Sequence, residues 1–241
     1  MHYRYWFQNI RHPVWYALAA GDFDLMLPIF NMYMAQMPVL EERSKQWYGH
    51  NGSQFAETSY FFGTYEQCDY GCGRSGVPEI TNPYIKHHYE GGVELAVMML
   101  RAYAYSGNDT FITQYALPWC LSLLTFYDEH YPKYPNGTLF LKDAQSCETW
   151  LNCDNPAPQV SALHLITNAL VNLPATLVPD ATQRAFFKRI HENLPDIPLT
   201  HTSTGTLSWT CCVSVLGVVV LLLRYLCCLS PSCRSFVLSS S

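Results

Sequence analysis

The sequence predicts an all-α fold, an incomplete α/α toroid of helical hairpins with short β-hairpin or loop insertions. Three observations predict it. Apolar and amphipathic helical segments alternate along residues 1–198, and short turns join them in pairs. Only 14% of the residues are charged, against about 25% in an ordinary domain, as expected for helices buried against one another. Two long loops rich in polar and aromatic residues, 47–83 and 142–158, connect the pairs.

The N-terminal part of the chain predicts two helices. Pro13 favours a first helical position and Gly21 favours a helix end, so residues 13–20 are expected to form a short helix. Asp22 is a suitable N-cap for a second, largely apolar helix, which is expected to end before Pro38. The two segments predict the first hairpin.

The middle of the chain predicts two longer helices and a strand. Residues 84–105 are expected to form a helix whose second half is apolar on almost every face, which is typical of a buried helix. The next helix covers 109–130, and Pro118 is expected to break or kink it. A turn then leads into a short strand at 138–141.

Two further helices precede residue 198. Residues 158–173 place apolar side chains three and four positions apart, as an amphipathic helix requires. Asp180 and Gln183 form a capping pair for a last helix that ends near Asn193.

The composition changes sharply near residue 198. Residues 1–196 carry a net charge of −7, whereas residues 197–241 contain no acidic residue, carry +2 and hold five of the ten cysteines. We therefore divide the chain into a toroid-like body, 1–198, and an apolar tail rich in Cys, Leu, Val and Ser, 199–241. Residues 207–226 have about the length of a membrane-spanning helix. The alternative interpretation is that the tail is non-native sequence.

Several functional classes are excluded or disfavoured by composition and motifs. A net charge of −5 disfavours a nucleic-acid binder, and no Rossmann glycine pattern, P-loop or Gly-x-Ser-x-Gly elbow is present. The first residues do not resemble a signal peptide. Glycosylation sequons at Asn51, Asn108 and Asn136 nevertheless favour an extracellular or membrane-associated protein.

The two long loops hold the candidate site residues. They combine carboxylates, amides and aromatic rings, a mixture suited to binding sugars, and glycosidic bond cleavage requires two carboxyl groups around one bond. The candidate pair is Glu57 and Glu148. The candidate substrate-binding residues are Trp47, His50, Asn51, Asp69, Glu90, Trp150 and Asn155. Helix capping, salt bridges and core packing are the structural alternatives for these residues.

No metal or cofactor is expected. Cys68-x3-Cys72 and Cys147-x5-Cys153, together with His87-His88, resemble zinc ligands loosely, but they lack the paired short spacers of a zinc site. Disulfide bonds or free thiols are the preferred interpretation.

Several sequence blocks carry a resemblance to a known enzyme superfamily. The most specific are AAGD at 19–22, FAET at 55–58 and CETW at 147–150, the last followed by Asn155-Pro156. On these blocks, residues 4–198 resemble the six-hairpin glycosidase superfamily. The match is to an uncharacterised branch near the inverting glycoside hydrolases that include α-L-fucosidases.

The resemblance implies an (α/α)6 barrel and hydrolysis of a glycan with inversion. It implies that the acid and base residues lie on the loops at one end of the barrel. Within those loops we assign Glu148 as the general acid and Glu57 as the general base or a substrate anchor; this assignment is our hypothesis and not part of the resemblance. About six or seven helices precede residue 198, fewer than the twelve of a complete ring, so we expect a truncated member. The alternative function is a non-catalytic carbohydrate-binding or interaction module that the tail tethers to a membrane.

Overall fold

The computed structural model describes residues 5–63, 82, 86–146, 150–201 and 207–209. The chain divides into two compact units, Met1–Ile197 and Pro198–Ser241. The described part of the first unit is mostly helical. Its longer helices are α1 (Phe7–Ala20), α2 (Leu27–Tyr48), α3 (Glu90–Ser106), α5 (Leu117–His130), α6 (Ala157–Val171) and α7 (Ala181–Glu192).

Shorter elements join these helices. A 3-10 turn, η1 (Phe23–Leu25), precedes α2, and one turn of helix, α4 (Asp109–Phe111), leads through the π-helix η2 (Ile112–Ala116) into α5. The strands β1 (Tyr5–Trp6) and β2 (Thr58–Ser59) pair antiparallel, with Trp6 opposite Thr58.

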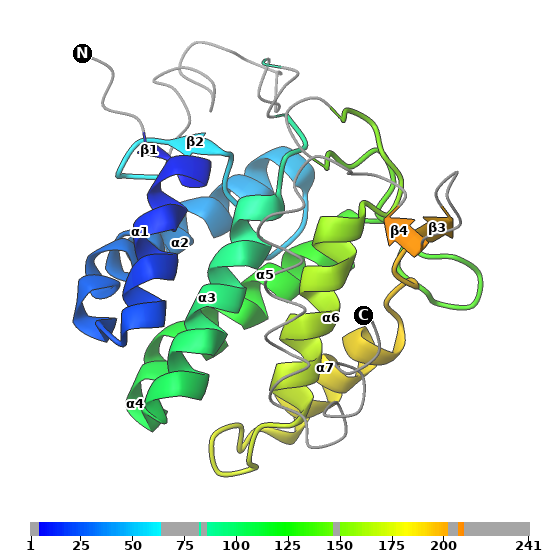
Figure 1. Ribbon diagram of the computed structural model, residues 1–241. Helices are drawn as coiled ribbons and strands as arrows, with labels where there is room; N and C mark the ends of the chain where they lie inside the picture. Colours follow the sequence, from blue (N-terminus) through cyan, green and yellow to red (C-terminus); the bar gives the residue numbers. More distant parts are fainter. Residues whose placement is uncertain (1–4, 64–81, 83–85, 147–149, 202–206, 210–241) are drawn as a thin grey trace, which may run out of the picture. The chain divides into compact units, whose positions relative to one another are not determined.

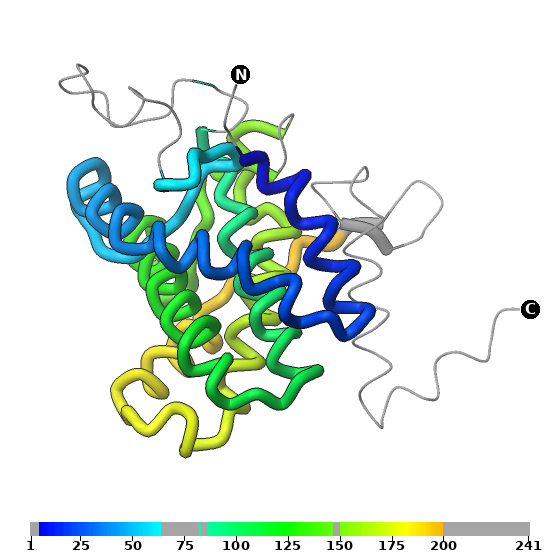
Figure 2. Tube along the Cα trace, turned by 90° about the vertical axis from the view of Figure 1, so that its left-hand side faces the viewer, coloured from blue at the N-terminus to red at the C-terminus, as the bar shows by residue number. Residues whose placement is uncertain are grey.

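The helices of the first unit form three hairpins in two layers. Figure 1 shows α1, α3 and α6 next to one another, with α2, α5 and α7 behind them. The contacts agree, because α3 packs against both α1 and α6, α2 packs against α5, and α6 packs against α7. Figure 2 shows α1 and α2 as the two arms of the first hairpin. This arrangement fits part of an α/α toroid.

Helix α3 occupies the centre of this unit, as its apolar sequence predicts. Buried residues run through the helix, and it ends at Gly107, which adopts the left-handed conformation. Two glycines near its start allow close packing. A Cβ atom at Gly91 would lie 2.7 Å from the ring of Phe55, and one at Gly92 would lie 3.0 Å from Leu123.

An aromatic cluster forms the core beside α3. The rings of Tyr33 and Phe55 are stacked with centroids 4.4 Å apart, and Phe7 and Trp119 pack against Phe55. The indole N–H of Trp119 donates to the carbonyl of Gly92 at 3.1 Å. The segment between α2 and β2 therefore belongs to the core, although its sequence is mostly polar.

The structure corrects the predicted limits of the first hairpin. Helix α1 begins at Phe7 rather than at Pro13, and α2 continues through Pro38 to Tyr48. A proline inside a helix removes one backbone hydrogen bond. In α2 the residues beyond Pro38 bury Leu40 and other side chains, and this packing offsets the lost bond.

The middle of the chain also differs from the sequence prediction. Helix α3 begins at Glu90, whereas the prediction began at residue 84. Pro118 does not break its helix, because the π-helix precedes it and Pro118 lies in the first turn of α5, where a missing N–H costs little. Residues 138–141 form an isolated bridge, Lys133 to Leu139, and not a strand.

The last two predicted helices are confirmed. Helix α6 covers Ala157–Val171 and α7 covers Ala181–Glu192. The carboxylate of Asp180 accepts from the backbone N–H groups of Thr182 and Gln183, as the capping prediction requires. Helix α7 buries Phe187 and Ile190 and exposes most of its other residues, as in an outer helix.

The described part of the second unit is a two-stranded sheet. Strands β3 (Leu199–His201) and β4 (Leu207–Trp209) pair antiparallel, with Leu199 opposite Trp209. The predicted membrane helix at 207–226 is not supported. Its first three residues form β4, and the others lie outside the described residues. Among the described helices, none combines the length and apolar character that crossing a bilayer requires.

Candidate functional site

Glu57 joins the β1–β2 strand pair to the start of α1. Its backbone carbonyl accepts from the N–H of Phe7 at 2.8 Å, and its Oε1 accepts from the N–H of Gln8 at 2.7 Å. The first N–H groups of a helix have no partner within the helix, and the helix dipole favours a negative charge beside them. Glu57 therefore explains why α1 begins six residues before Pro13.

The carboxyl group of Glu57 is buried, with only 2% of its side chain exposed. Burial raises the pKa of Glu57 to about 7, while His88, the Gln8 N–H and Arg11 act to lower it and Glu90 acts to raise it. A carboxyl group with a pKa near 7 exchanges its proton at neutral pH, which is a property of acid–base catalysts.

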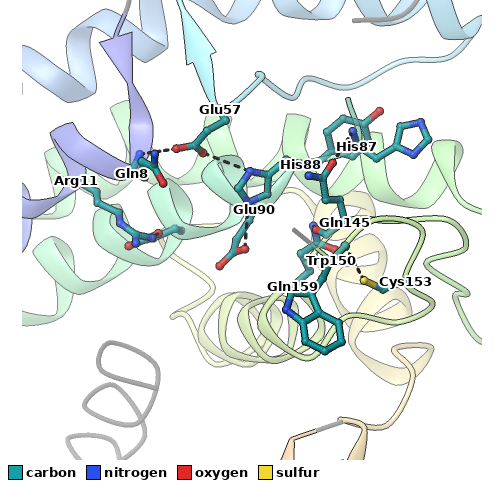
Figure 3. Close-up of polar contacts among 12 residues, drawn as sticks. Gln8, Arg11, Glu57, His87, His88, Glu90, Gln145, Trp150, Cys153 and Gln159 are labelled. Carbon is teal, nitrogen blue, oxygen red and sulfur yellow. Dashed lines mark hydrogen bonds and ion pairs between the residues drawn. The ribbon is translucent and has the colours of Figure 1, made fainter. Parts of the chain in front are cut away.

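His88 lies between two carboxyl groups. Its Nδ1 is 3.8 Å from Oε2 of Glu57, and its Nε2 is 3.4 Å from Oε2 of Glu90 (Figure 3). His88 is buried and lies two residues before the start of α3. Glu90 is the first residue of α3 and is partly exposed. The three side chains form the Glu57–His88–Glu90 cluster.

Glu94 is held one turn further along α3 by a separate set of contacts. Arg11 Nη1 donates to its Oε2 at 2.6 Å, and the indole N–H of Trp15 donates to its Oε1 at 2.8 Å. Burial raises the pKa of Glu94, and Arg11 and Trp15 counteract it. Glu94 therefore connects α1 to α3.

The second long loop is attached to the residues next to His88. The side-chain carbonyl of Gln145 accepts from the backbone N–H of His87 at 3.4 Å, and His87 Nδ1 contacts the carbonyl of Asp143 at 2.8 Å. The amide of Gln159 in α6 donates to the Gln145 carbonyl at 3.0 Å. Gln145 and Gln159 are buried, so this part of the loop is fixed to α6.

Glu148 lies outside the described residues, as does Asp69. The residues on either side of 147–149 are connected, because the N–H of Ser146 donates to the carbonyl of Trp150 at 3.2 Å. The side chain of Trp150 is 45% exposed. Asn155 has a local role, since its Oδ1 accepts from the N–H of Leu141 at 2.9 Å and its φ is +46°.

Three further candidates lie near the ends of α2 and α5. His50 Nε2 contacts His130 Nδ1 at 2.9 Å and stacks on Tyr48. Asn51 binds the carboxylate of Glu129 through its backbone N–H at 2.8 Å. Trp47 is half-buried at the end of α2.

A pair of tyrosines links these three candidates to the segment that contains His88. The hydroxyl groups of Tyr48 and Tyr89 are 3.3 Å apart, and Tyr89 follows His88 in the sequence. Burial, with His50, His87 and Arg43, lowers the pKa of His130 to about 3, so it stays neutral. The structure therefore places Glu57 and Glu90 around His88, and it places Trp47, His50 and Asn51 at the ends of α2 and α5.

His88 is the residue of this cluster that sequence reasoning missed. The sequence presents His87-His88 as a pair of metal-ligand candidates, but only His88 lies between the carboxyl groups. No local sequence pattern distinguishes His88 from its neighbour His87. Among the described residues no group of three or more His, Cys, Asp or Glu side chains could hold a metal ion. Cys68, Cys72 and Cys147 lie outside those residues.

Comparison with known proteins identifies the fold class. No family model matches the chain, and no curated protein matches it. A solved α/α-barrel structure that bears the provisional name kojibiose phosphorylase, from the human microbiome, matches with a TM-score of 0.57 and 10% identity. The match covers 83% of this chain and 29% of that one. The chain thus shares the helical fold of part of that structure and spans less than a third of its length.

Proposed function

We propose that the chain forms part of a carbohydrate-active α/α-barrel enzyme that hydrolyses a glycosidic bond. The observation that carries the proposal is the buried carboxyl group of Glu57, whose pKa lies near 7 beside His88 and Glu90. The fold shared with part of a carbohydrate-active enzyme supports the substrate class. The substrate is a glycan or oligosaccharide.

The proposed reaction uses Glu57 and Glu148 in different roles. Glu57 acts as the general base and takes a proton from a water molecule, whose oxygen forms a bond to the anomeric carbon. The glycosidic C–O bond breaks, and Glu148 donates a proton to the departing oxygen, as in inverting hydrolysis. The contact of Gln145 with His87 supports this pairing, because it attaches a residue three positions before Glu148 to the neighbour of His88.

An activity screen with matched variants tests this proposal. Aryl glycosides of both anomeric configurations and kojibiose are assayed with and without inorganic phosphate. Glu57→Gln and Glu148→Gln should each reduce kcat by about 10²–10⁴-fold, as expected for general acid–base catalysts. Glu192→Gln, at the end of α7, is the control and should retain wild-type activity. If turnover requires inorganic phosphate, the reaction is phosphorolysis and the proposed hydrolysis is wrong.

A non-catalytic carbohydrate-binding module is the second candidate function. It is favoured by the 2% exposure of the Glu57 side chain and by the exposed indole of Trp150, a suitable stacking surface for a sugar ring. In this case no glycoside is turned over, whereas Trp150→Ala weakens glycan binding and Glu57→Gln does not. Tethering to a membrane through residues 207–226 would belong to this second function. If the chain neither cleaves nor binds glycans, both functions are wrong.

A further inference from the structure

The imidazole of His88 has a carboxyl oxygen beside each of its ring nitrogens. Nδ1 faces Oε2 of Glu57 and Nε2 faces Oε2 of Glu90, while the other oxygen of Glu57 already accepts from Gln8 (Figure 3). Neither nitrogen of His88 therefore points to solvent or to an apolar wall. A histidine in this position is sensitive to the charge of both carboxyl groups.

Counting protons gives two favourable states for this arrangement. In the first, His88 is an imidazolium and both nitrogens donate to ionised carboxylates. In the second, His88 is neutral with its proton on Nε2, and a protonated Glu57 donates to Nδ1. Nε2–H donates to Glu90 in both states. The states differ only by one proton, which lies on Nδ1 or on Oε2 of Glu57.

Among the described residues, His88 is the group of opposite charge that acts most strongly on Glu57. Arg11 of α1 also acts on Glu57, but its guanidinium binds Glu94 at 2.6 Å. Tyr33 of α2 remains protonated, because burial raises its pKa. Glu90 of α3 repels charge on Glu57.

His87 provides a contrast with His88. It is adjacent in sequence, but its Nδ1 contacts the backbone carbonyl of Asp143, and Figure 3 shows its ring on the side away from Glu57. A substitution at His87 therefore changes an imidazole of the same segment without touching the carboxyl groups of Glu57 and Glu90.

We infer that His88 is a positioning residue that shares one proton with Glu57, and that Glu90 fixes the orientation and the Nε2–H form of its imidazole. The inference rests on the proposed function in assigning this proton to the reaction. The form that acts as a base has one proton fewer, with Glu57 ionised and no proton on Nδ1. When Glu57 has taken a proton from water, the new O–H bond of Glu57 breaks and an Nδ1–H bond of His88 forms. The resulting positive charge lies between two carboxylates, and no electron is transferred. The 3.8 Å separation must shorten for this step, as is common when a substrate binds.

The decisive experiment is an NMR titration of Glu57 in the full-length protein labelled with ¹³C at glutamate side-chain carboxyls. Glu57→Gln identifies the signal. In wild type the signal should titrate near the pKa of about 7. In His88→Gln it should titrate at higher pH, because the positive charge that favours the carboxylate is lost. His87→Gln should titrate as wild type. If the Glu57 signals of wild type and His88→Gln coincide, the inference is wrong.

A second variant keeps the test decisive if His88→Gln does not fold. Glu90→Met removes the acceptor of Nε2–H, so the long-range ¹H–¹⁵N spectrum of His88 should change from the Nε2–H tautomer to a mixture. If His88 keeps the Nε2–H tautomer in Glu90→Met, Glu90 does not fix the form of the imidazole and that part of the inference is wrong. His87→Gln again serves as the reference for both spectra.

Kinetics separate the inference from the proposed function. His88→Gln should lower kcat by about tenfold near pH 6 and recover activity at higher pH, because Glu57 must lose its proton to act as a base. If Glu57→Gln is inactive but His88→Gln does not shift the titration of Glu57, the inference is wrong and the proposed function stands. If wild type is inactive but His88→Gln shifts the titration of Glu57, the proposed function is wrong and the proton sharing stands.

Discussion

Glu57 has a carboxyl group whose burial and hydrogen bonding act in opposite directions. Burial favours its neutral form, whereas His88 and the Gln8 N–H favour its charged form, and burial prevails. A group whose pKa is raised by folding binds its proton more tightly in the folded state. The free energy of unfolding must therefore fall as pH rises between the unfolded and folded pKa values.

The first prediction is that Glu57→Gln removes a pH dependence of stability. The pKa of Glu57 changes from an ordinary 4.5 to about 7 on folding. This difference corresponds to about 3 kcal/mol of unfolding free energy, which wild type loses as pH rises from 4.5 through 7. Glutamine has the same shape and does not titrate, so the unfolding free energy of Glu57→Gln should fall by about 3 kcal/mol less than that of wild type over this pH range. Urea unfolding of both proteins at a series of pH values measures it, and parallel curves would contradict it.

At the residue scale, the sequence singled out two members of the Glu57–His88–Glu90 cluster, and their roles in a reaction stay predictions. Glu57 and Glu90 were expected because acidic residues lie in or beside loops rich in amides and aromatic rings. His88 was not selected, because its role depends on Glu57, which is 31 positions away in the sequence. Contacts over such a distance follow from the pairing of β1 with β2 and from the packing of α1 on α3, and no local pattern encodes them.

Elements of the fold depend on glycines for two different reasons. Gly52 and Gly107 both have positive φ, 88° and 62°. A Cβ atom at Gly52 would lie 2.1 Å from the backbone nitrogen of Phe126, whereas nothing lies within 4 Å of one at Gly107. Gly52 is therefore required by the close approach of the loop to α5, and Gly107 only by its backbone conformation.

The second prediction compares alanine at these two positions. Gly107→Ala should cost about 1 kcal/mol, the usual cost of a left-handed conformation for alanine. Gly52→Ala should cost at least about 3 kcal/mol, because the backbone of α5 must move as well. Thermal unfolding of the two variants measures the difference. Equal costs would show that the loop does not press on α5.

The third prediction concerns the start of α7. Asp180 accepts from the N–H groups of Thr182 and Gln183, and Asp180→Ala removes both bonds. The loss should be about 1 kcal/mol, and Asp180→Asn should restore most of it, because asparagine is an equally good N-cap. Urea unfolding of the two variants checks this. If Asp180→Asn is as unstable as Asp180→Ala, the negative charge matters more than the hydrogen bonds.

A helix can be predicted from the sequence when residues within the same segment determine where it begins and ends. Helices α6 and α7 were predicted well because caps, prolines and apolar spacing within each segment define them. The limits of α1 and α2 were not, since Pro13 and Pro38 lie inside the helices and tertiary contacts determine their ends. The N–H groups that start α1 bind Glu57, which lies in another part of the chain.

At the scale of the whole molecule, the first unit should be stable without the second. The division falls between Ile197 and Pro198, and helix α7 belongs to the first unit. Helix α7 contributes Phe187 and Ile190, which are 0% and 4% exposed. Its packing against α6 is part of the core.

The fourth prediction is that truncation after residue 197 leaves stability unchanged within about 0.5 kcal/mol, whereas truncation after residue 178 does not. The shorter chain lacks α7 and exposes the surface of α6. Losing two buried side chains should cost about 3–6 kcal/mol. The urea midpoints of the two truncated chains and of the full chain measure this. A large loss on truncation after 197 would show that the second unit supports the first.

Gly91 and Gly92 have a consequence for sequence divergence. A Cβ atom at Gly91 would lie 2.7 Å from the ring of Phe55 and one at Gly92 would lie 3.0 Å from Leu123, so a side chain at either position requires its neighbour to shift. Relatives that keep this helix packing should retain both glycines while surface positions drift. The pair can therefore serve as an alignment anchor between distant relatives, where ordinary residue matching no longer fixes the register.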